Sequence, residues 1–276
     1  MIRFLMTCMF NIILTTFTWA NDTFLFQAEK EEVKIKIFGT LHSLSLQTLP
    51  FALTDYIKNH EVLITENTQV LEPLTLDMCA RMGLLRNSEE PNYYTTLIKE
   101  EKEELDAYAI PFLNYKQAHN LSIDDLSVNG LFQAYIMGHF LNGMDYALLN
   151  HYKNHKLIVG LENLQEVSQS FEQLTINELK AGLQCKAGFG SEEHKMSDDL
   201  YLSGHIPDTE EEDDMVQERN LKWLPTLINY HEQYGEKAII CVGYLHLLGD
   251  SDLLRLLEKT GYQITRANQA IEFSPF

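Results

Sequence analysis

Two short apolar segments, far apart in this chain, end in the same way. Val33–Phe38 leads into Gly39-Thr-Leu-His42, and Ala238–Val242 leads into Gly243-Tyr-Leu-His246. Glycine accepts tight turns that other residues resist, so each pattern predicts a strand that stops at a sheet edge and places an imidazole there. If the two strands are neighbours, the imidazoles converge, and converging imidazoles indicate a metal site or an acid–base site.

The remaining strand patterns favour a parallel sheet. A helix is expected at Gln47–Asn59 and a strand at Glu61–Thr65, which delivers Glu66 at its end. This strand–helix–strand order is typical of parallel pairing. Lys156–Val159 is a further short strand, and it leads into Gly160-Leu-Glu162, so the third copy of the pattern carries a carboxylate.

The middle of the chain has helical patterns. They run from Leu74 to His155, with breaks expected at Pro91, Pro111 and Asn129-Gly130, and we interpret residues 74–155 as a helical insertion or cap. Glu100 to Glu104 is expected to be a solvated helix face. The other expected elements are helices at Gln165–Leu174, Thr175–Leu183, Met215–Tyr234 and Asp252–Lys259, a loop-rich stretch at Gly188–Pro207, and a closing strand at Tyr262–Arg266.

The fold class that follows is α/β, with a single domain, a mixed and largely parallel sheet, a helical cap, and functional side chains at strand ends. The acidic run Asp208–Asp214 lacks the spacing of a calcium loop, and we expect it to stabilise the N-terminus of the next helix.

The first 20 residues have the pattern of a secretory signal peptide. Arg3 precedes an uncharged and mostly apolar segment, Phe4–Phe17, and Thr18-Trp19-Ala20 offers small residues for cleavage. An uncleaved anchor is the alternative, although the segment is shorter than the about 20 residues that span a bilayer. We therefore expect residues 21–276 to form an exported domain, periplasmic or secreted, with no stable membrane span after cleavage.

The charge and the cysteine content of the chain exclude some classes of partner and of fold. The net charge of −19 disfavours nucleic acid, because an acidic surface repels phosphates. Cys79, Cys185 and Cys241 follow the signal segment, which is too few for a disulfide framework. Cys79 and Cys185 could pair in an oxidising compartment, whereas Cys241, inside a strand, is expected to be a small buried hydrophobe.

Several features occur together in order: Gly39-Thr-Leu-His42, Glu66, Gly160-Leu-Glu162-Asn163, Glu218-Arg219-Asn220 with Trp223, and Gly243-Tyr-Leu-His246. In this arrangement the chain resembles the TraB/GumN family, which includes the Tiki proteases that cleave Wnt proteins. The resemblance covers almost all of the chain after residue 20.

The resemblance implies a metal-dependent hydrolase with an α/β fold, related in architecture to the erythromycin-esterase and ChaN groups. It implies that His42, Glu66 and His246 hold the metal. It also implies that Arg219 corresponds to the arginine of an Arg-Asn pair that is found in the family. The Tiki branch uses manganese or cobalt, other branches sequester or inactivate peptide pheromones, and ChaN-like relatives bind haem. One departure is Asn67, near where the family often has a second acidic residue.

The residue types are consistent with that chemistry. Imidazole and carboxylate ligands suit manganese, cobalt, zinc or iron. Glu162 could act as the general base, and Arg219 could stabilise an oxyanion or hold a substrate carboxylate. Arg219 could instead form only a structural salt bridge, Trp223 is expected in the core, and His151 with His155 is a weaker metal candidate at a helix end.

The sequence thus predicts a peptidase-like metallohydrolase that acts on a peptide or protein outside the cytoplasm. The alternatives are a binding protein that sequesters a peptide or haem without turnover, and a family member that acts only through protein contacts.

Overall fold

The computed structural model describes residues 24–68, 72–118, 120–163, 174–188, 191–204, 214–249 and 252–267. Its strands are β1 (Leu25–Lys30), β2 (Val33–Thr40), β3 (Val62–Asn67), β4 (Leu157–Glu162), β5 (Ala238–Gly243) and β6 (Gln263–Arg266). Its helices are α2 (Phe51–Asn59), α3 (Leu76–Arg81), α4 (Lys99–Tyr115), α5 (Val128–Phe140), α6 (Met144–Tyr152), α8 (Ile176–Gln184), α9 (Glu192–Leu202), α10 (Asp214–Tyr234) and α11 (Leu253–Lys259).

The strands form one mixed sheet in the order β4-β3-β5-β2-β1-β6. The pairs β4–β3, β3–β5 and β5–β2 are parallel, whereas β1 is antiparallel to both β2 and β6. The expected single-domain α/β fold with a largely parallel sheet is therefore confirmed. Strands β2 and β5 lie side by side, with Thr40 opposite Gly243, so both Gly-x-x-His motifs start at the same sheet edge.

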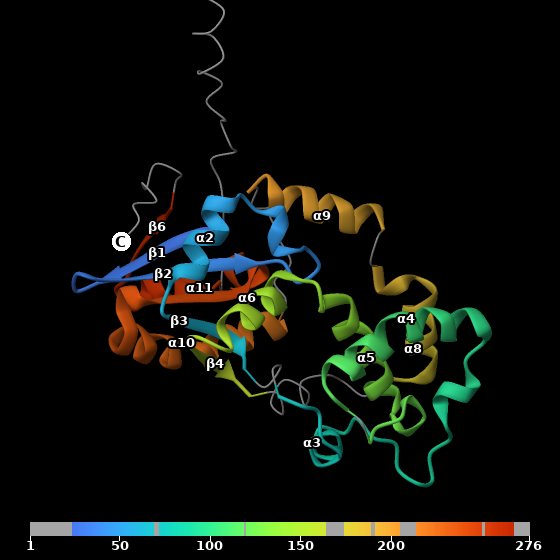
Figure 1. The fold of residues 1–276 in the computed structure, drawn as a ribbon. Coiled ribbons are helices and arrows are strands. Elements are labelled where there is room, and N and C mark those ends of the chain that lie inside the picture. The colour runs from blue at the N-terminus through green and yellow to red at the C-terminus, as the bar shows by residue number, and fades with distance from the viewer. Residues whose placement is uncertain are drawn as a thin grey trace, which may run out of the picture.

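The crossovers determine which helices cover each face. The chain moves from β2 to β3 and on to β4 in one direction across the sheet, and from β4 to β5 and on to β6 in the other. Because crossovers between parallel strands are right-handed, α2 and α6 cover one face, and α10 and α11 cover the opposite face (Figure 1). The loops after β2 and β3 therefore leave toward one face and the loop after β5, which lies between them, leaves toward the other. Open α/β sheets bind ligands where neighbouring loops diverge in this way.

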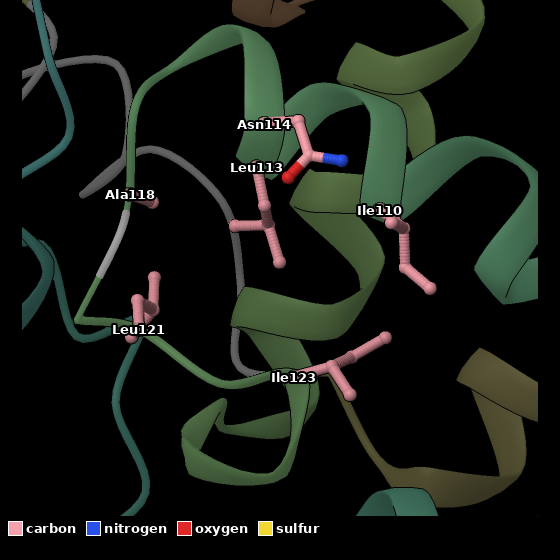
Figure 2. A pocket seen from close by; sticks show the side chains of 6 residues that line it. All are labelled: Ile110, Leu113, Asn114, Ala118, Leu121 and Ile123. Atoms are coloured by element: carbon pink, nitrogen blue, oxygen red, sulfur yellow. The ribbon is translucent and has the colours of Figure 1, made fainter.

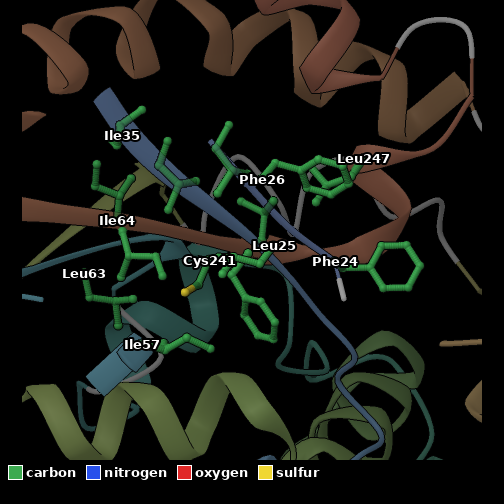
Figure 3. Close-up of a cluster of buried hydrophobic side chains, with 14 of the residues drawn as sticks. Phe24, Leu25, Phe26, Ile35, Ile57, Leu63, Ile64, Cys241 and Leu247 are labelled. Carbon is green, nitrogen blue, oxygen red and sulfur yellow. The ribbon is translucent and has the colours of Figure 1, made fainter. Parts of the chain in front are cut away.

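The core of the sheet is continuous and apolar. Figure 3 shows side chains of β1, β2, β3 and β5 gathered with Ile57 of α2 and with Leu247 beyond β5. Leu63 and Ile64 of β3 are fully buried, and Cys241 in β5 is 1% exposed, so the expectation of a buried apolar cysteine is confirmed. Near-continuous apolar strands of this kind are typical of parallel sheets that are covered on both faces.

A second apolar cluster lies beyond the end of the sheet, among α3, α4, α5 and α8 (Figure 1). Leu105 and Ala109 of α4 pack there with Leu131 of α5 and Leu179 of α8, and all four are fully buried. Within the described residues the cysteines are free: Cys79 lies buried in this cluster and Cys185 is exposed. None of the helices in the described part of the chain is long and apolar enough to cross a bilayer.

Four local expectations were wrong or incomplete. Pro111 lies inside α4 instead of ending it, and Asn129-Gly130 falls in the first turn of α5, whose N-cap is Ser127. Residues 192–202 form α9 where a loop was expected. Glu101 is not solvated: it is 4% exposed, because its carboxylate accepts hydrogen bonds from the Ile98 N–H and the Gln184 side chain.

The sequence analysis also missed β1. This strand forms a hairpin with β2, and the two residues between them, Glu31 and Glu32, both have positive φ values of 53° and 67°. Glycine or asparagine is the usual signal for such a turn, and neither is present here. The predicted signal peptide, the helix expected at Gln165–Leu174 and residues 208–213 of the acidic run lie outside the described residues. Asp214 does lie in the first turn of α10.

Replacing Leu63 by Ala tests the centre of this core. Leu63 is fully buried in β3, so the cavity should lower the free energy of unfolding by about 2–5 kcal/mol, as measured by chemical denaturation. Leu221→Ala is the matched control, because Leu221 on α10 is 57% exposed and should change stability by no more than about 0.5 kcal/mol. Equal effects of the two substitutions would contradict the assigned core.

Candidate functional site

His42 follows β2 and is held by a carboxylate from a distant helix. Its Nδ1 lies 2.5 Å from Oδ2 of Asp145, and Oδ1 of Asp145 accepts a hydrogen bond of 2.8 Å from the Thr40 hydroxyl. Asp145 lies in the first turn of α6, where a helix dipole favours negative charge. The α6 N-cap, Gly143, allows the close approach, because a Cβ there would lie 1.8 Å from the backbone oxygen of His42. This arrangement fixes the ring and directs Nε2 away from Asp145.

Glu66 lies at the end of β3 and faces the start of the second motif. Its Oε1 accepts a hydrogen bond of 2.7 Å from the Gly243 N–H. A Cβ on Gly243 would lie 3.3 Å from this oxygen and 3.2 Å from Nε2 of His42. The carboxylate of Glu66 and the imidazole of His42 therefore border one small space, which a methyl group at position 243 would fill.

Arg219 of α10 joins two of the carboxylates. It donates to Oε2 of Glu66 at 2.6 Å and to both oxygens of Glu162, at 2.5 and 3.2 Å. The indole N–H of Trp223 donates a further hydrogen bond of 3.0 Å to Glu162. The Arg219 guanidinium also lies 4.7 Å from the centre of the Trp223 ring. Trp223 is 1% exposed, so the expectation that it belongs to the core is confirmed.

His246 lies behind Glu66, on the buried side. It is 4% exposed in the short 3₁₀ turn Tyr244–Leu247, and its Nε2 lies 3.7 Å from Oε1 of Glu66. Its Nδ1 lies 2.8 Å from the side-chain oxygen of Asn220, and its ring packs 4.3 Å from the Trp223 ring. Both imidazoles thus have Nδ1 anchored by an oxygen acceptor, and both have Nε2 on the side of Glu66.

A pocket of about 190 Å³ opens in front of these groups. Four of the five residues singled out from the sequence line it, namely His42, Glu66, Glu162 and Arg219, whereas His246 contacts Glu66 from outside the pocket. Asp145 lines it too, together with apolar residues of α5 and α6. His151, the weaker candidate at the end of α6, is exposed and does not line this pocket.

A second hollow, of about 170 Å³, lies in the helical part and has a different character. Figure 2 shows its side chains, which come from the end of α4 and from residues 118–123. The lining is apolar except for Asn114, with Ile110, Leu113, Ala118, Leu121 and Ile123 around it. In the described part of the chain, the acid–base groups that were expected to act together therefore lie at the sheet edge. They do not line this hollow.

The neighbouring charges alter the pKa values at the sheet edge. Burial would raise the pKa of Glu66, but the cationic neighbours His246, Arg219 and His42 outweigh it and lower the pKa to about 2. The side chain of His42 is 39% exposed, and its partial desolvation lowers its pKa. The Asp145 carboxylate raises the pKa by more than this, so that the net value is about 9. Burial raises the pKa of Glu162 above its ordinary value, against the hydrogen bonds from Arg219.

Two residues of this arrangement were not predicted from the sequence. Asp145 is 103 positions from His42 and carries no motif, so no sequence signal identified it. Asn220 was visible beside Arg219, but its hydrogen bond to His246 depends on how α10 packs against the turn Tyr244–Leu247. Within the described residues, no group of three His, Cys, Asp or Glu side chains is placed to hold a metal ion as it stands.

The profile of the TraB/PrgY/gumN family matches residues 24–266. The chain belongs to this family. The match begins before β1 and ends with β6, so it spans every described strand and confirms the resemblance seen in the sequence. No curated protein and no solved structure matches the chain significantly.

The bond between Asp145 and His42 predicts a specific titration. In chelator-treated protein, Asp145→Asn should lower the pKa of His42 from about 9 to its ordinary value of 6.5 or below, because the carboxylate that stabilises the imidazolium is lost. The His42 ring resonances in a histidine-labelled NMR sample report this pKa.

The same bond predicts how stability depends on pH. A folded-state pKa raised above the unfolded value contributes stability that is complete below about pH 6.5 and is lost as the pH rises through about 9. The parent should therefore lose its stability advantage over Asp145→Asn across that interval. Asp199→Asn, on α9, is the control. An unchanged His42 titration in Asp145→Asn would contradict the assigned contact.

Proposed function

We propose that this protein is a metal-dependent, peptidase-like hydrolase that acts on a peptide or protein outside the cytoplasm. One observation carries the proposal. Two imidazoles from motifs about 200 residues apart border a single carboxylate, Glu66, each with Nδ1 already anchored by an oxygen acceptor. An oxygen acceptor that holds Nδ1 in this way orients Nε2 of a histidine for metal binding.

The donor chemistry fits a divalent metal ion. Nε2 of His42, Nε2 of His246 and Oε1 of Glu66 form a nitrogen-and-oxygen set without thiolate, which suits manganese, cobalt or zinc. The 3.7 Å between His246 and Glu66 is close to the about 3.4 Å that separates two ligands of one ion with bonds near 2.1 Å. Glu66 is ion-paired with Arg219, so a bound ion and the guanidinium would both interact with this carboxylate.

A bound divalent ion supplies Lewis-acid polarisation of an amide carbonyl and makes a nearby water more acidic. The remaining groups act around that centre. Arg219 carries the positive charge beside Glu66 that would stabilise a developing oxyanion. Glu162 has a raised pKa and lies within hydrogen-bond distance of Arg219, so we assign it the role of accepting a proton. Asp145 and Asn220 are positioning residues for the two imidazoles.

Export is part of the proposal and rests on the amino-terminal sequence. Arg3 followed by the uncharged segment Phe4–Phe17 is the pattern of a secretory signal. The acidic net charge of −19 supports a peptide or protein substrate over a nucleic acid.

Metal binding is the first test. Isothermal titration with manganese, cobalt and zinc should give about one ion per chain in the parent, and His42→Ala and His246→Ala should each remove it, because each removes one of three ligands. Asp145→Asn should weaken binding by about 10- to 100-fold, since it removes only the anchor of His42.

His151→Ala is the matched control, because His151 is an exposed histidine on α6 away from the pocket. Its metal stoichiometry should equal that of the parent. Retention of the full stoichiometry in both His42→Ala and His246→Ala would rule out the shared site.

Turnover is the second test. With the metal present, Glu162→Gln should lower kcat for peptide hydrolysis by about 10²- to 10⁴-fold, because glutamine cannot accept the proton. Glu218→Gln changes a neighbouring carboxylate that is 75% exposed, and it should leave kcat unchanged. Product formation is followed by mass spectrometry on a mixed peptide substrate. Equal rates in parent and Glu162→Gln would remove Glu162 from the mechanism.

The alternative function makes the opposite prediction. A protein that only sequesters a peptide or haem would bind its ligand stoichiometrically without product, and haem binding would give a Soret absorption band. Metal bound at His42 and His246 without hydrolysis of any peptide would favour this alternative.

A further inference from the structure

The pocket at the sheet edge has two unlike walls. One wall is polar and comes from the strand ends and α10, with Thr65 and Asn67 beside Glu66. The other wall is largely apolar: α5 supplies Met137 and Phe140, and α6 supplies Leu149 and the ring of Tyr146 besides the carboxylate of Asp145. Leu149 and Tyr146 are nearly fully buried, whereas Met137 and Phe140 are half-buried, so these two present the accessible apolar surface.

The charged groups that line the pocket already have partners. Arg219 is paired with Glu66 and Glu162 at 2.6 and 2.5 Å. Asp145 accepts one hydrogen bond from the Thr40 hydroxyl, and its other carboxylate oxygen lies against Nδ1 of His42. A charged substrate side chain that entered the pocket would have to break one of these pairs or lose its hydration without a counter-ion, and both are costly.

The apolar wall lies directly beside the reacting groups. The Phe140 ring centre lies 5.3 Å from that of His42. A cavity of about 150 Å³ is known to hold a benzene ring, so about 190 Å³ has room for one large apolar side chain. A peptide whose amide bond lies at His42 and Glu66 would therefore place its adjacent side chain against Phe140 and Met137.

We infer that the substrate carries a large uncharged apolar side chain, such as leucine, methionine or phenylalanine, next to the bond that is cut, and that Phe140 and Met137 select it. This inference rests on the proposed hydrolase function, since it names the substrate class of the same site.

Two capped hexapeptides that differ only at the central residue, leucine in one and aspartate in the other, test this inference. With the manganese-loaded full chain, kcat/KM should favour the leucine peptide by about 10- to 200-fold, the range expected for a hydrophobic pocket. Binding of the same peptides, each labelled with fluorescein, is measured by fluorescence anisotropy in chelator-treated protein, and it should show a preference of the same direction.

Phe140→Ala should reduce the preference to a few-fold, and Phe140→Leu should retain most of it, because leucine restores an apolar surface. Phe51→Ala is the matched control: Phe51 is 83% exposed on α2 and its removal should leave the preference unchanged. Met137→Gln, which keeps the side-chain volume, is compared in the same way with Met196→Gln on α9, where the methionine is 60% exposed.

The outcomes separate the inference from the hydrolase proposal. Equal cleavage of both peptides, or a preference that survives Phe140→Ala and Met137→Gln, would overturn the inference and leave the hydrolase standing. A leucine preference in binding that depends on Phe140, with no cleavage under any metal, would support the ligand class and reject hydrolysis. Failure of both peptides to bind would overturn the inference.

Discussion

The parallel pairing of β2 with β5 is the contact on which the candidate site depends. Its register sets Gly39 opposite Val242 and Thr40 opposite Gly243, so two motifs from opposite ends of the chain turn away from the sheet at the same level. The loop after β5 also leaves toward the face opposite to the loops after its neighbours β2 and β3, and open α/β sheets have room for a ligand where loops diverge in this way. A shift of one residue in the register would reverse the faces of the strand's side chains.

Electrostatics then decides what can occupy that room. Glu66 and Glu162 end adjacent parallel strands, and Arg219 offsets the repulsion between them. Breaking a buried ion pair of this kind by removing one partner leaves an uncompensated charge, which typically costs about 3–5 kcal/mol. In our proposal Arg219 therefore has two roles. Without a metal ion it stabilises the folded protein by pairing with Glu66 and Glu162, and during hydrolysis it stabilises the developing oxyanion.

Much of the fold could be predicted from the sequence because its parallel strands are short apolar runs, and β2, β4 and β5 each run into a glycine. The glycine signal identified His42 and His246, and the strand–helix–strand order identified Glu66 at the end of the intervening strand. Asp145 could not be predicted, because its role comes from the packing of α6 against the loop after β2 and not from a local pattern. Strand β1 was missed because a local signal is absent. The turn between β1 and β2 has positive φ at Glu31 and Glu32, without the glycine that normally indicates such a turn.

The central claim is that both imidazoles and Glu66 hold a single ion. The most direct measurement is a crystal structure of the manganese-soaked protein with anomalous diffraction recorded for manganese. The account predicts one anomalous peak within about 2.0–2.4 Å of Nε2 of His42, Nε2 of His246 and Oε1 of Glu66. A peak bound elsewhere, or an ordered site without manganese at saturating concentration, would contradict it.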